Sequence, residues 1–410
     1  MNQTQNNWKR KTLLFLASQC ITLFGSMIVQ MSIIWYVTLK TSSGGWVAAF
    51  TICSYLPQFL ISFFAGVWAD RYNRKKLIVL ADGVITIATL IMFLVMPMIS
   101  SDFVLLSALL VISIVRSIGA GVQTPAVNAV IPHLVPAEYL MKYNGINATI
   151  QSIVQFIAPA VAGTVLSIGT FRSTLFIDIL TALIGIGLLS CVLLPKQEVA
   201  NDNISVFSEI KAGIHYSFSD KMIGKILIVY GLFILLSVPA GFMSALLVSR
   251  VYGDVYWYLT VVELVGFAGM ALGGVLMGMW GGFKSRVKTF AFGLLILSIM
   301  TIGMGVSPYF ILYLVMLFVY SIALTIIQTA TTTIIQEKAE GSMLGRVFGL
   351  VGAMYSGFLP VGMAIFGPLA DILPLQWIMV GSGIAFIGVT VYLQSKSKLD
   401  MQMTNSNLSN

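Results

Sequence analysis

The stretch that decides the fold is a short polar loop between two apolar runs, Gly66-Val-Trp68-Ala-Asp70-Arg71-Tyr-Asn-Arg74-Lys75-Lys76. A degraded copy follows about half the chain later, at Gly278-Met-Trp280-Gly-Gly282-Phe-Lys284-Ser-Arg286-Val-Lys288. A glycine, a tryptophan, an arginine and a lysine hold the same places in both loops. A repeat at this spacing predicts two related halves, each with a basic turn at the same point of its path.

The composition on either side of these loops predicts an all-α membrane protein. Of the 410 residues, 58% are hydrophobic and only 9% are charged, and the mean hydropathy is +0.94. Uncharged runs long enough to cross a hydrocarbon layer of about 30 Å as helices recur along the chain. We predict twelve transmembrane helices: 12–37, 46–69, 77–99, 103–131, 139–168, 171–194, 223–249, 255–281, 288–306, 309–335, 343–370 and 375–394.

These spans form two six-helix pseudo-repeats, which we place in bundles 1–194 and 223–395. Residues 195–222 are predicted to be a cytoplasmic linker, and the tail 396–410 is too polar to pack and is expected to be disordered. Within the linker an apolar helical face predicts an amphipathic helix on the membrane surface, with a disordered linker as the alternative. That face is formed by Phe207, Ile210, Ile214 and Phe218.

The excess of basic over acidic residues indicates how the chain is oriented in the membrane rather than nucleic-acid binding. The net charge is +8, but with twelve spans nearly all lysines and arginines fall on one side, which the positive-inside rule assigns to the cytoplasm. Both termini are then cytoplasmic. The three cysteines lie in apolar runs, and neither His133 nor His215 has partners at metal-ligand spacing. We therefore expect no metal, no cofactor, no enzyme activity and no nucleic-acid partner.

At this point the chain resembles the major facilitator superfamily. The first loop is similar to that superfamily's signature between helices 2 and 3, with Gly66, Asp70, Arg71 and Arg74 in place. An arginine followed by glycines at 116–121 resembles a second family motif. The segment Ala158-Pro159-Ala-Val-Ala-Gly163 is a glycine-poor counterpart of the antiporter motif.

The stretch 115–136 and the sequence Phe176-Ile-Asp178 look like the bacterial drug-efflux branch that contains macrolide exporters. The resemblance implies the major facilitator fold, in which two six-helix bundles surround a central cavity lined by helices 1, 4, 7 and 10.

The residues of the first loop are predicted to act as a conformational switch. A carboxylate at a helix end, Asp70, can bind basic residues or the N-terminus of a neighbouring helix and so favour one bundle arrangement. Gly66 permits close helix approach. We assign Arg71 and Arg74 to the same switch.

Three ionisable residues lie well inside the predicted spans, where a charge facing lipid is costly: Arg116, Asp178 and Glu263. Glu263 is the leading candidate for binding the coupling proton or a cation, with a structural hydrogen bond as the alternative. For Asp178 we favour a structural role, in which Arg172 or a helix terminus satisfies its carboxylate. Asp82 is expected to pair with the basic loop.

The presumed cavity helices carry uncharged polar and aromatic side chains, which suit a large amphiphile better than a sugar or a phosphate ester. The candidate cavity residues are Gln30, Trp35, Tyr36, Gln123, Asn128, Tyr230, Phe233, Phe242 and Gln328. The sequence contains no phosphate loop of the G-x-x-x-x-G-K-[ST] type, which argues against ATP-driven transport by this chain alone.

Together these features predict a monomeric exporter in the bacterial plasma membrane that works by alternating access, antiporting protons against macrolide- or tetracycline-like amphiphiles. One alternative is an exporter or flippase of an endogenous amphiphile such as a siderophore or a lysophospholipid. Another is a sensor of the same fold that transports nothing.

Overall fold

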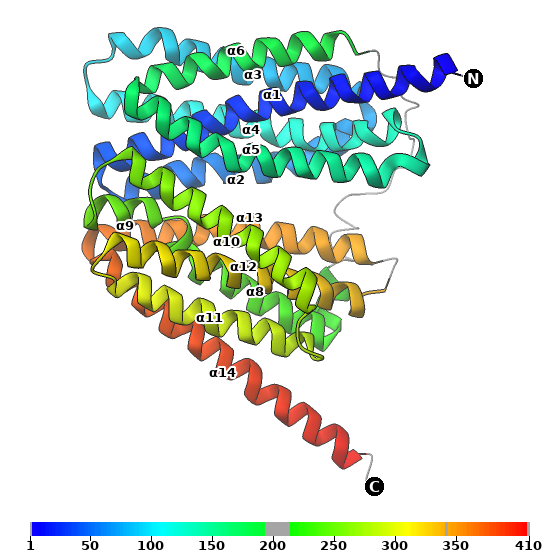
Figure 1. The fold of residues 1–410 in the computed structure, drawn as a ribbon, viewed down its shortest axis with the longest axis vertical. Helices are drawn as coiled ribbons and strands as arrows, with labels where there is room; N and C mark the ends of the chain where they lie inside the picture. Colours follow the sequence, from blue (N-terminus) through cyan, green and yellow to red (C-terminus); the bar gives the residue numbers. More distant parts are fainter. Residues whose placement is uncertain (1, 193–213, 341–342, 408–410) are drawn as a thin grey trace. The chain divides into compact units, whose positions relative to one another are not determined.

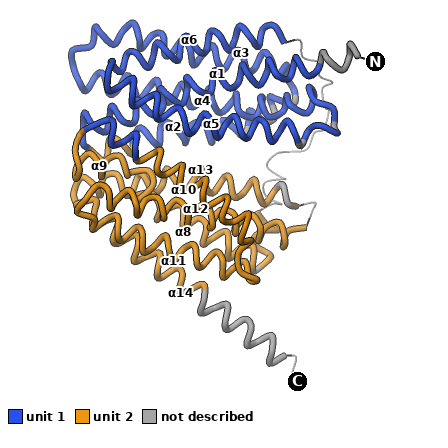
Figure 2. The backbone as a smooth tube through the Cα atoms, viewed as in Figure 1, with its two compact units in different colours: residues 1–42, 49–203, 255–261 blue, residues 43–48, 204–254, 262–410 orange. Residues whose placement is uncertain are grey.

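The computed structural model describes residues 2–192, 214–340 and 343–407, and within these ranges the chain is helical without a strand (Figure 1). In the described residues twelve helices are long and apolar enough to cross a membrane, judged by length and composition. The predicted fold class, an all-α protein with twelve spans, is confirmed. The structure divides into two compact units (Figure 2).

Unit 1 comprises residues 1–42, 49–203 and 255–261. Its main helices are α1 (Asn2–Thr41), α2 (Gly44–Arg71), α3 (Arg74–Val95), α4 (Asp102–Leu134), α5 (Leu140–Ile168) and α6 (Phe171–Ser190), with short 3-10 turns η1 (Met96–Met98) and η2 (Ala137–Tyr139). Within the unit α1 packs on α5 and α6, and α3 packs on α4 and α6.

Unit 2 comprises residues 43–48, 204–254 and 262–410, so it includes the first turn of α2. Its helices are α8 (Lys221–Gly241), α9 (Ser244–Val251), α10 (Tyr256–Trp280), α11 (Arg286–Val306), α12 (Phe310–Lys338), α13 (Leu344–Ile372) and α14 (Leu375–Asn407), although the start of α10, residues 256–261, belongs to unit 1. Here α11 packs on α12 and α14, and α8 packs on α13 and α14.

One span differs from the sequence-based expectation. The predicted span 223–249 is two helices, because α8 ends at Gly241 and α9 begins at Ser244. The disorder expected from residue 396 stays a prediction. The predicted amphipathic helix lies largely outside the described residues, of which 214–219 are helical.

The two echoing loops begin the following helix in the same way, each within its own unit. Asn73 caps α3 by accepting a hydrogen bond from the Lys76 backbone N–H at 3.1 Å, and Ser285 caps α11 in the same way from Lys288 at 3.5 Å. Arg74 donates to the Ala69 carbonyl and Arg286 donates to the Gly281 carbonyl, and in both bonds the donor nitrogen lies 2.9 Å from the carbonyl oxygen. These four pairs are in register, so the repeat seen in the sequence is also a repeat of capping geometry.

One position explains why the second loop has lost a carboxylate. Gly282 stands where the first loop has Asp70, and its φ is +79°. The preceding Gly281 also has a positive φ, of +70°. Glycine adopts this left-handed backbone without the steric cost that a side chain brings, so the second loop turns by a path that disfavours an aspartate at this place.

Candidate functional site

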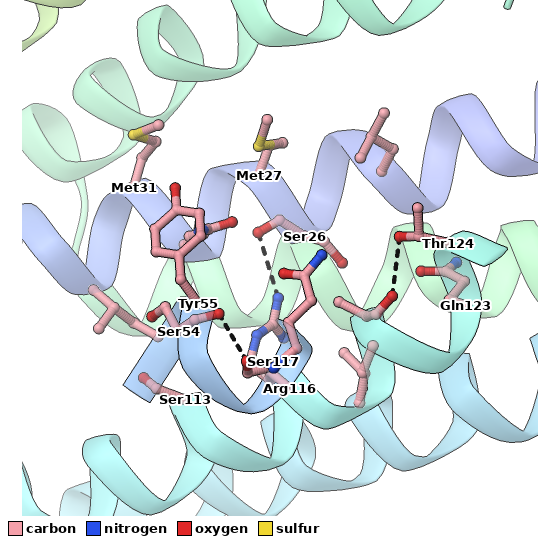
Figure 3. A pocket seen from close by; sticks show the side chains of 16 residues that line it. Ser26, Met27, Met31, Ser54, Tyr55, Ser113, Arg116, Ser117, Gln123 and Thr124 are labelled. Atoms are coloured by element: carbon pink, nitrogen blue, oxygen red, sulfur yellow. Dashed lines mark hydrogen bonds between the residues drawn. The ribbon is translucent and has the colours of Figure 1, made fainter. Parts of the chain in front are cut away.

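A polar cavity of about 300 Å³ lies inside unit 1, between α1, α2 and α4, with one residue from α3 (Figure 3). Its apolar wall includes Leu23, Met27, Met31 and Ile85, whereas its polar groups are uncharged apart from Arg116. The polar residues on the lining are Ser26, Gln30, Ser54, Tyr55, Gln58, Ser113, Arg116, Ser117, Gln123 and Thr124. The cavity can therefore surround an apolar body and offer several hydrogen bonds at once.

The arginine of the cavity wall is held by an aspartate behind it. Arg116 of α4 forms an ion pair with Asp178 of α6, and the two residues are only 9% and 2% exposed. Thr89 of α3 accepts a hydrogen bond from Arg116 and donates one to the Asp178 carboxylate over 3.1 Å. Pairing at this depth offsets part of the cost of burying both charges.

The partner expected for Asp178 was wrong. Arg172 instead donates to the Phe93 carbonyl over 3.1 Å, and its guanidinium lies 4.1 Å from the centre of the Phe93 ring. Asp178 is about two helical turns further along α6 than Arg172, which puts it level with Arg116 rather than with the end of the helix.

Asp82 of α3 lies behind another part of the cavity wall. Gln123, which lines the cavity, donates its amide N–H to Asp82 Oδ1 over 2.7 Å. Asp82 is 5% exposed. The expected pairing with the basic loop was wrong, because Asp82 lies eight residues beyond Arg74, or about 12 Å along the helix.

The cavity draws on α2, which the sequence-based list of lining helices left out. Pro57 lies inside α2, and next to it the Ser117 hydroxyl of α4 donates to the Ser54 carbonyl over 2.7 Å and accepts from the Gln58 N–H over 2.9 Å. The Ser117 hydroxyl thus lies between the Gln58 N–H and the Ser54 carbonyl, which would otherwise pair within one turn of α2, and it opens α2 toward the cavity. The signal in the sequence was the polar cluster around Pro57 in an otherwise apolar run.

The predicted site residues of unit 1 divide into two sets. Gln30, Gln123 and Arg116 come together on the cavity, while Trp35, Tyr36 and Asn128 do not belong to its lining. Trp35 is buried in the helix packing, and the Tyr36 ring stacks on Phe171 at 4.8 Å between centres. Asn128 is exposed, one turn beyond Thr124.

The candidates of unit 2 do not belong to the lining of this cavity. Tyr230 and Phe233 are buried and pack against each other with ring centres 5.8 Å apart. Phe242 follows the end of α8, and Gln328 is exposed. Glu263 is half-buried on α10 and, among the residues that the structure describes, has no hydrogen-bond or ion-pair partner.

The structure describes the switch residues only in part. The side chain of Asp70 and the surroundings of Gly66 lie outside the described part of the structure. Arg71 is exposed. Arg74 donates to the Ala69 carbonyl and, over 3.0 Å, to the Ala129 carbonyl of α4, so it joins the loop to the end of that helix.

A second polar cluster, which the sequence analysis missed, lies in unit 2 at the first turn of α2. The Asp371 carboxylate accepts hydrogen bonds from the Gly44 N–H at 2.6 Å, the Gly45 N–H at 2.8 Å and the Ser43 hydroxyl at 2.9 Å. Arg250 completes it with an ion pair of 3.0 Å. A carboxylate at a helix N-terminus satisfies backbone N–H groups that have no partner within the helix.

Twelve apolar helices, with a partly open cavity inside unit 1, are the features of a multi-pass membrane transporter. A crystal structure of the nucleoside transporter NupG has the same fold, with a TM-score of 0.75, 12% identity, and coverage of 95% of this chain and 99% of that one. The chain belongs to the Major Facilitator Superfamily, whose family model matches residues 14–261.

Two curated relatives cover the whole length. The macrolide efflux protein A of Streptococcus pyogenes is 28% identical over 404 residues, which span 97% of this chain and 99% of the relative. The staphyloferrin A transporter of Staphylococcus aureus is 21% identical and spans 97% of this chain and 100% of that protein. The family resemblance predicted from the first loop is thus confirmed.

Proposed function

We propose that this protein is a proton-coupled exporter of amphiphilic antibiotics, with macrolides as the leading substrate class. The observation that carries the proposal is the cavity of unit 1, where methionine and leucine side chains stand beside glutamine, serine and threonine groups. A macrolide offers the matching surface, an apolar ring with hydroxyl and carbonyl groups. The macrolide efflux relative supports the same substrate class.

The alternative substrate is a siderophore, which the similarity to a staphyloferrin A transporter raises. A carboxylate-rich siderophore requires positive charge in the cavity. Arg116 is the only charged residue on the lining, and Asp178 already neutralises it. The cavity is therefore better suited to an uncharged or cationic amphiphile than to a polyanion.

In the proposed cycle the protein is a monomer in the bacterial plasma membrane, with both termini in the cytoplasm. Gly66, Asp70, Arg71 and Arg74 control closure on the cytoplasmic side. Glu263 of unit 2 binds the coupling proton. Its position in a predicted span, without a described partner, supports this role.

Transport by the purified protein in proteoliposomes tests the proposal. We expect an imposed pH gradient to drive accumulation of a labelled macrolide, to drive tetracycline less well, and to leave a hydroxycarboxylate siderophore unmoved. Glu263→Gln should abolish gradient-driven accumulation but retain exchange of labelled for unlabelled macrolide. Siderophore transport without macrolide transport would overturn the substrate class, and full gradient-driven export by Glu263→Gln would overturn the coupling assignment.

A further inference from the structure

A buried carboxyl group behind the cavity is not used by the function proposed above. Asp82 is 5% exposed, and its Oδ1 accepts the hydrogen bond from Gln123. Its Oδ2 is buried and has no hydrogen-bond partner among the described residues. An ionised carboxylate with one free oxygen is expensive to keep away from water, so a proton or a nearby cation must compensate it.

The charged groups around Asp82 do not supply that compensation. Helix α4 contributes Arg116, and helix α6 contributes Asp178, whose charge interacts with Asp82. The 3-10 turn η1, which also packs on α3, contains only methionine and proline. Arg116 is engaged by Asp178 and Thr89. The cluster therefore holds two carboxylates for one guanidinium.

The other charged groups on these helices have partners elsewhere. Arg172 of α6 binds the Phe93 carbonyl, and His133 of α4 lies against Arg74 and the Ala129 carbonyl. Asp102, at the other end of α4, forms an ion pair with Lys40 over 2.6 Å. On α3 itself, Lys75 donates to the Ser190 and Val192 carbonyls and Lys76 is exposed, so no ion pair between Asp82 and a cation is found among the described residues.

Asp82 is connected to the cavity through two neighbouring residues. Gln123, which Figure 3 labels on the cavity wall, joins the Asp82 carboxylate directly to that wall. Ile85, one turn after Asp82 on the same face of α3, is itself part of the lining. A buried charge acts over a longer range than one in water, because the protein interior screens it less.

We propose that Asp82 is a proton-binding site that exchanges its proton for the positive charge of a cationic amphiphile in this cavity. With the cavity empty, a proton on Asp82 balances the cluster. When a lipophilic cation binds, its charge compensates the carboxylate, and the proton leaves for solvent. The inference rests on the proposed export function and names the charge of its substrate.

Thermodynamic linkage fixes the direction in which cation binding changes with pH. A cation that favours ionised Asp82 must bind more tightly as the pH rises, and a proton on Asp82 must weaken cation binding by the same factor. Coupling between two sites in one protein is typically about 5–150-fold. An anion of the same size should bind with the opposite pH dependence.

Tetraphenylphosphonium and tetraphenylborate are suitable probes because they match in size, have opposite charges and carry no proton that titrates. Binding to the purified full-length protein is measured in weakly buffered detergent with a pH-indicator dye. We expect the wild type to release protons on binding the phosphonium and not on binding the borate. The infrared carbonyl band of a protonated carboxyl group should decrease at the same time.

Asp82→Asn should abolish proton release and the pH dependence of phosphonium binding, while Asp82→Glu should keep both. Asp102→Asn is the matched control, because it removes an exposed carboxylate from the same unit. Undiminished proton release by folded Asp82→Asn would overturn the inference. So would a wild type whose infrared carboxyl band does not respond to the phosphonium, a measurement that needs no variant.

The outcomes separate this inference from the proposed function. If the wild type exports no macrolide but releases a proton that Asp82→Asn abolishes, the export proposal fails and the proton site stands. If macrolide export is confirmed and Asp82→Asn releases protons like the wild type, only the site fails.

Discussion

Replacing Arg116 with methionine removes the one cation from a buried cluster that contains Asp82 and Asp178. Breaking a buried ion pair costs about 3–5 kcal/mol, since the remaining charge is left without compensation. With about 2–4 °C lost per kcal/mol in a domain of 150–250 residues, unfolding should begin about 6–20 °C earlier. The loss should shrink as the pH falls, because protonation removes charge from carboxylates that have lost their cation.

The assay is thermal unfolding of the purified protein in detergent, followed by helical circular dichroism at several pH values. The double variant Arg116→Met/Asp178→Leu should regain at least half of the loss, because replacing both partners with apolar groups leaves no orphaned pair. Arg172→Gln is the matched control and should cost under about 1 kcal/mol, since Arg172 is exposed. The reasoning is refuted if Arg116→Met costs under about 1 kcal/mol, or if the double variant unfolds as easily as the single one.

Three further predictions concern other parts of the molecule. Asp371→Asn should cost about 1.5–3 kcal/mol in thermal unfolding, because hydrogen bonds to a carboxylate at the start of α2 become bonds to a neutral amide; Asp254→Asn serves as the control. Gly121→Ala should reduce macrolide binding, since its Cβ would lie 2.1 Å from an Ile61 methyl and push α4 from α2 beside the cavity, whereas Gly145→Ala has open space and should bind normally. Asp70→Asn should retain substrate binding in equilibrium dialysis but lose export, and unchanged export would contradict the switch.

The parts of the fold that the sequence predicts are those written in local patterns. Twelve apolar runs correspond to twelve helical candidate spans in the described residues, because a membrane span must satisfy its own backbone hydrogen bonds. The repeat seen in the two loops is also a repeat in the structure, since Asn73 and Ser285 cap the following helices in the same way. The break after Gly241 was missed, because the apolar run continues across it and hydropathy does not register a change of direction.

The site was predictable in its residue types and not in its pairings. Arg116 and Asp178 were recognised as costly buried charges, but their contact depends on how α4 and α6 pack, which no spacing along the chain encodes. Ser117 shows the same limit. Its two bonds to α2 require a neighbouring helix with Pro57 at that level, and serine in a span otherwise reads as a small packing residue.

The pairings also define the charge around the cavity. From the sequence alone, Arg116 is only a charge that would be costly facing lipid. In the structure Arg116 is bound by Asp178, and Asp82 adds a second carboxylate behind Gln123, so the cluster around the cavity has more negative groups than positive ones. A site with one carboxylate in excess can hold a proton or a cationic amphiphile. Because one negative charge does not favour both at once, we expect a proton on Asp82 and a cation in the cavity to compete.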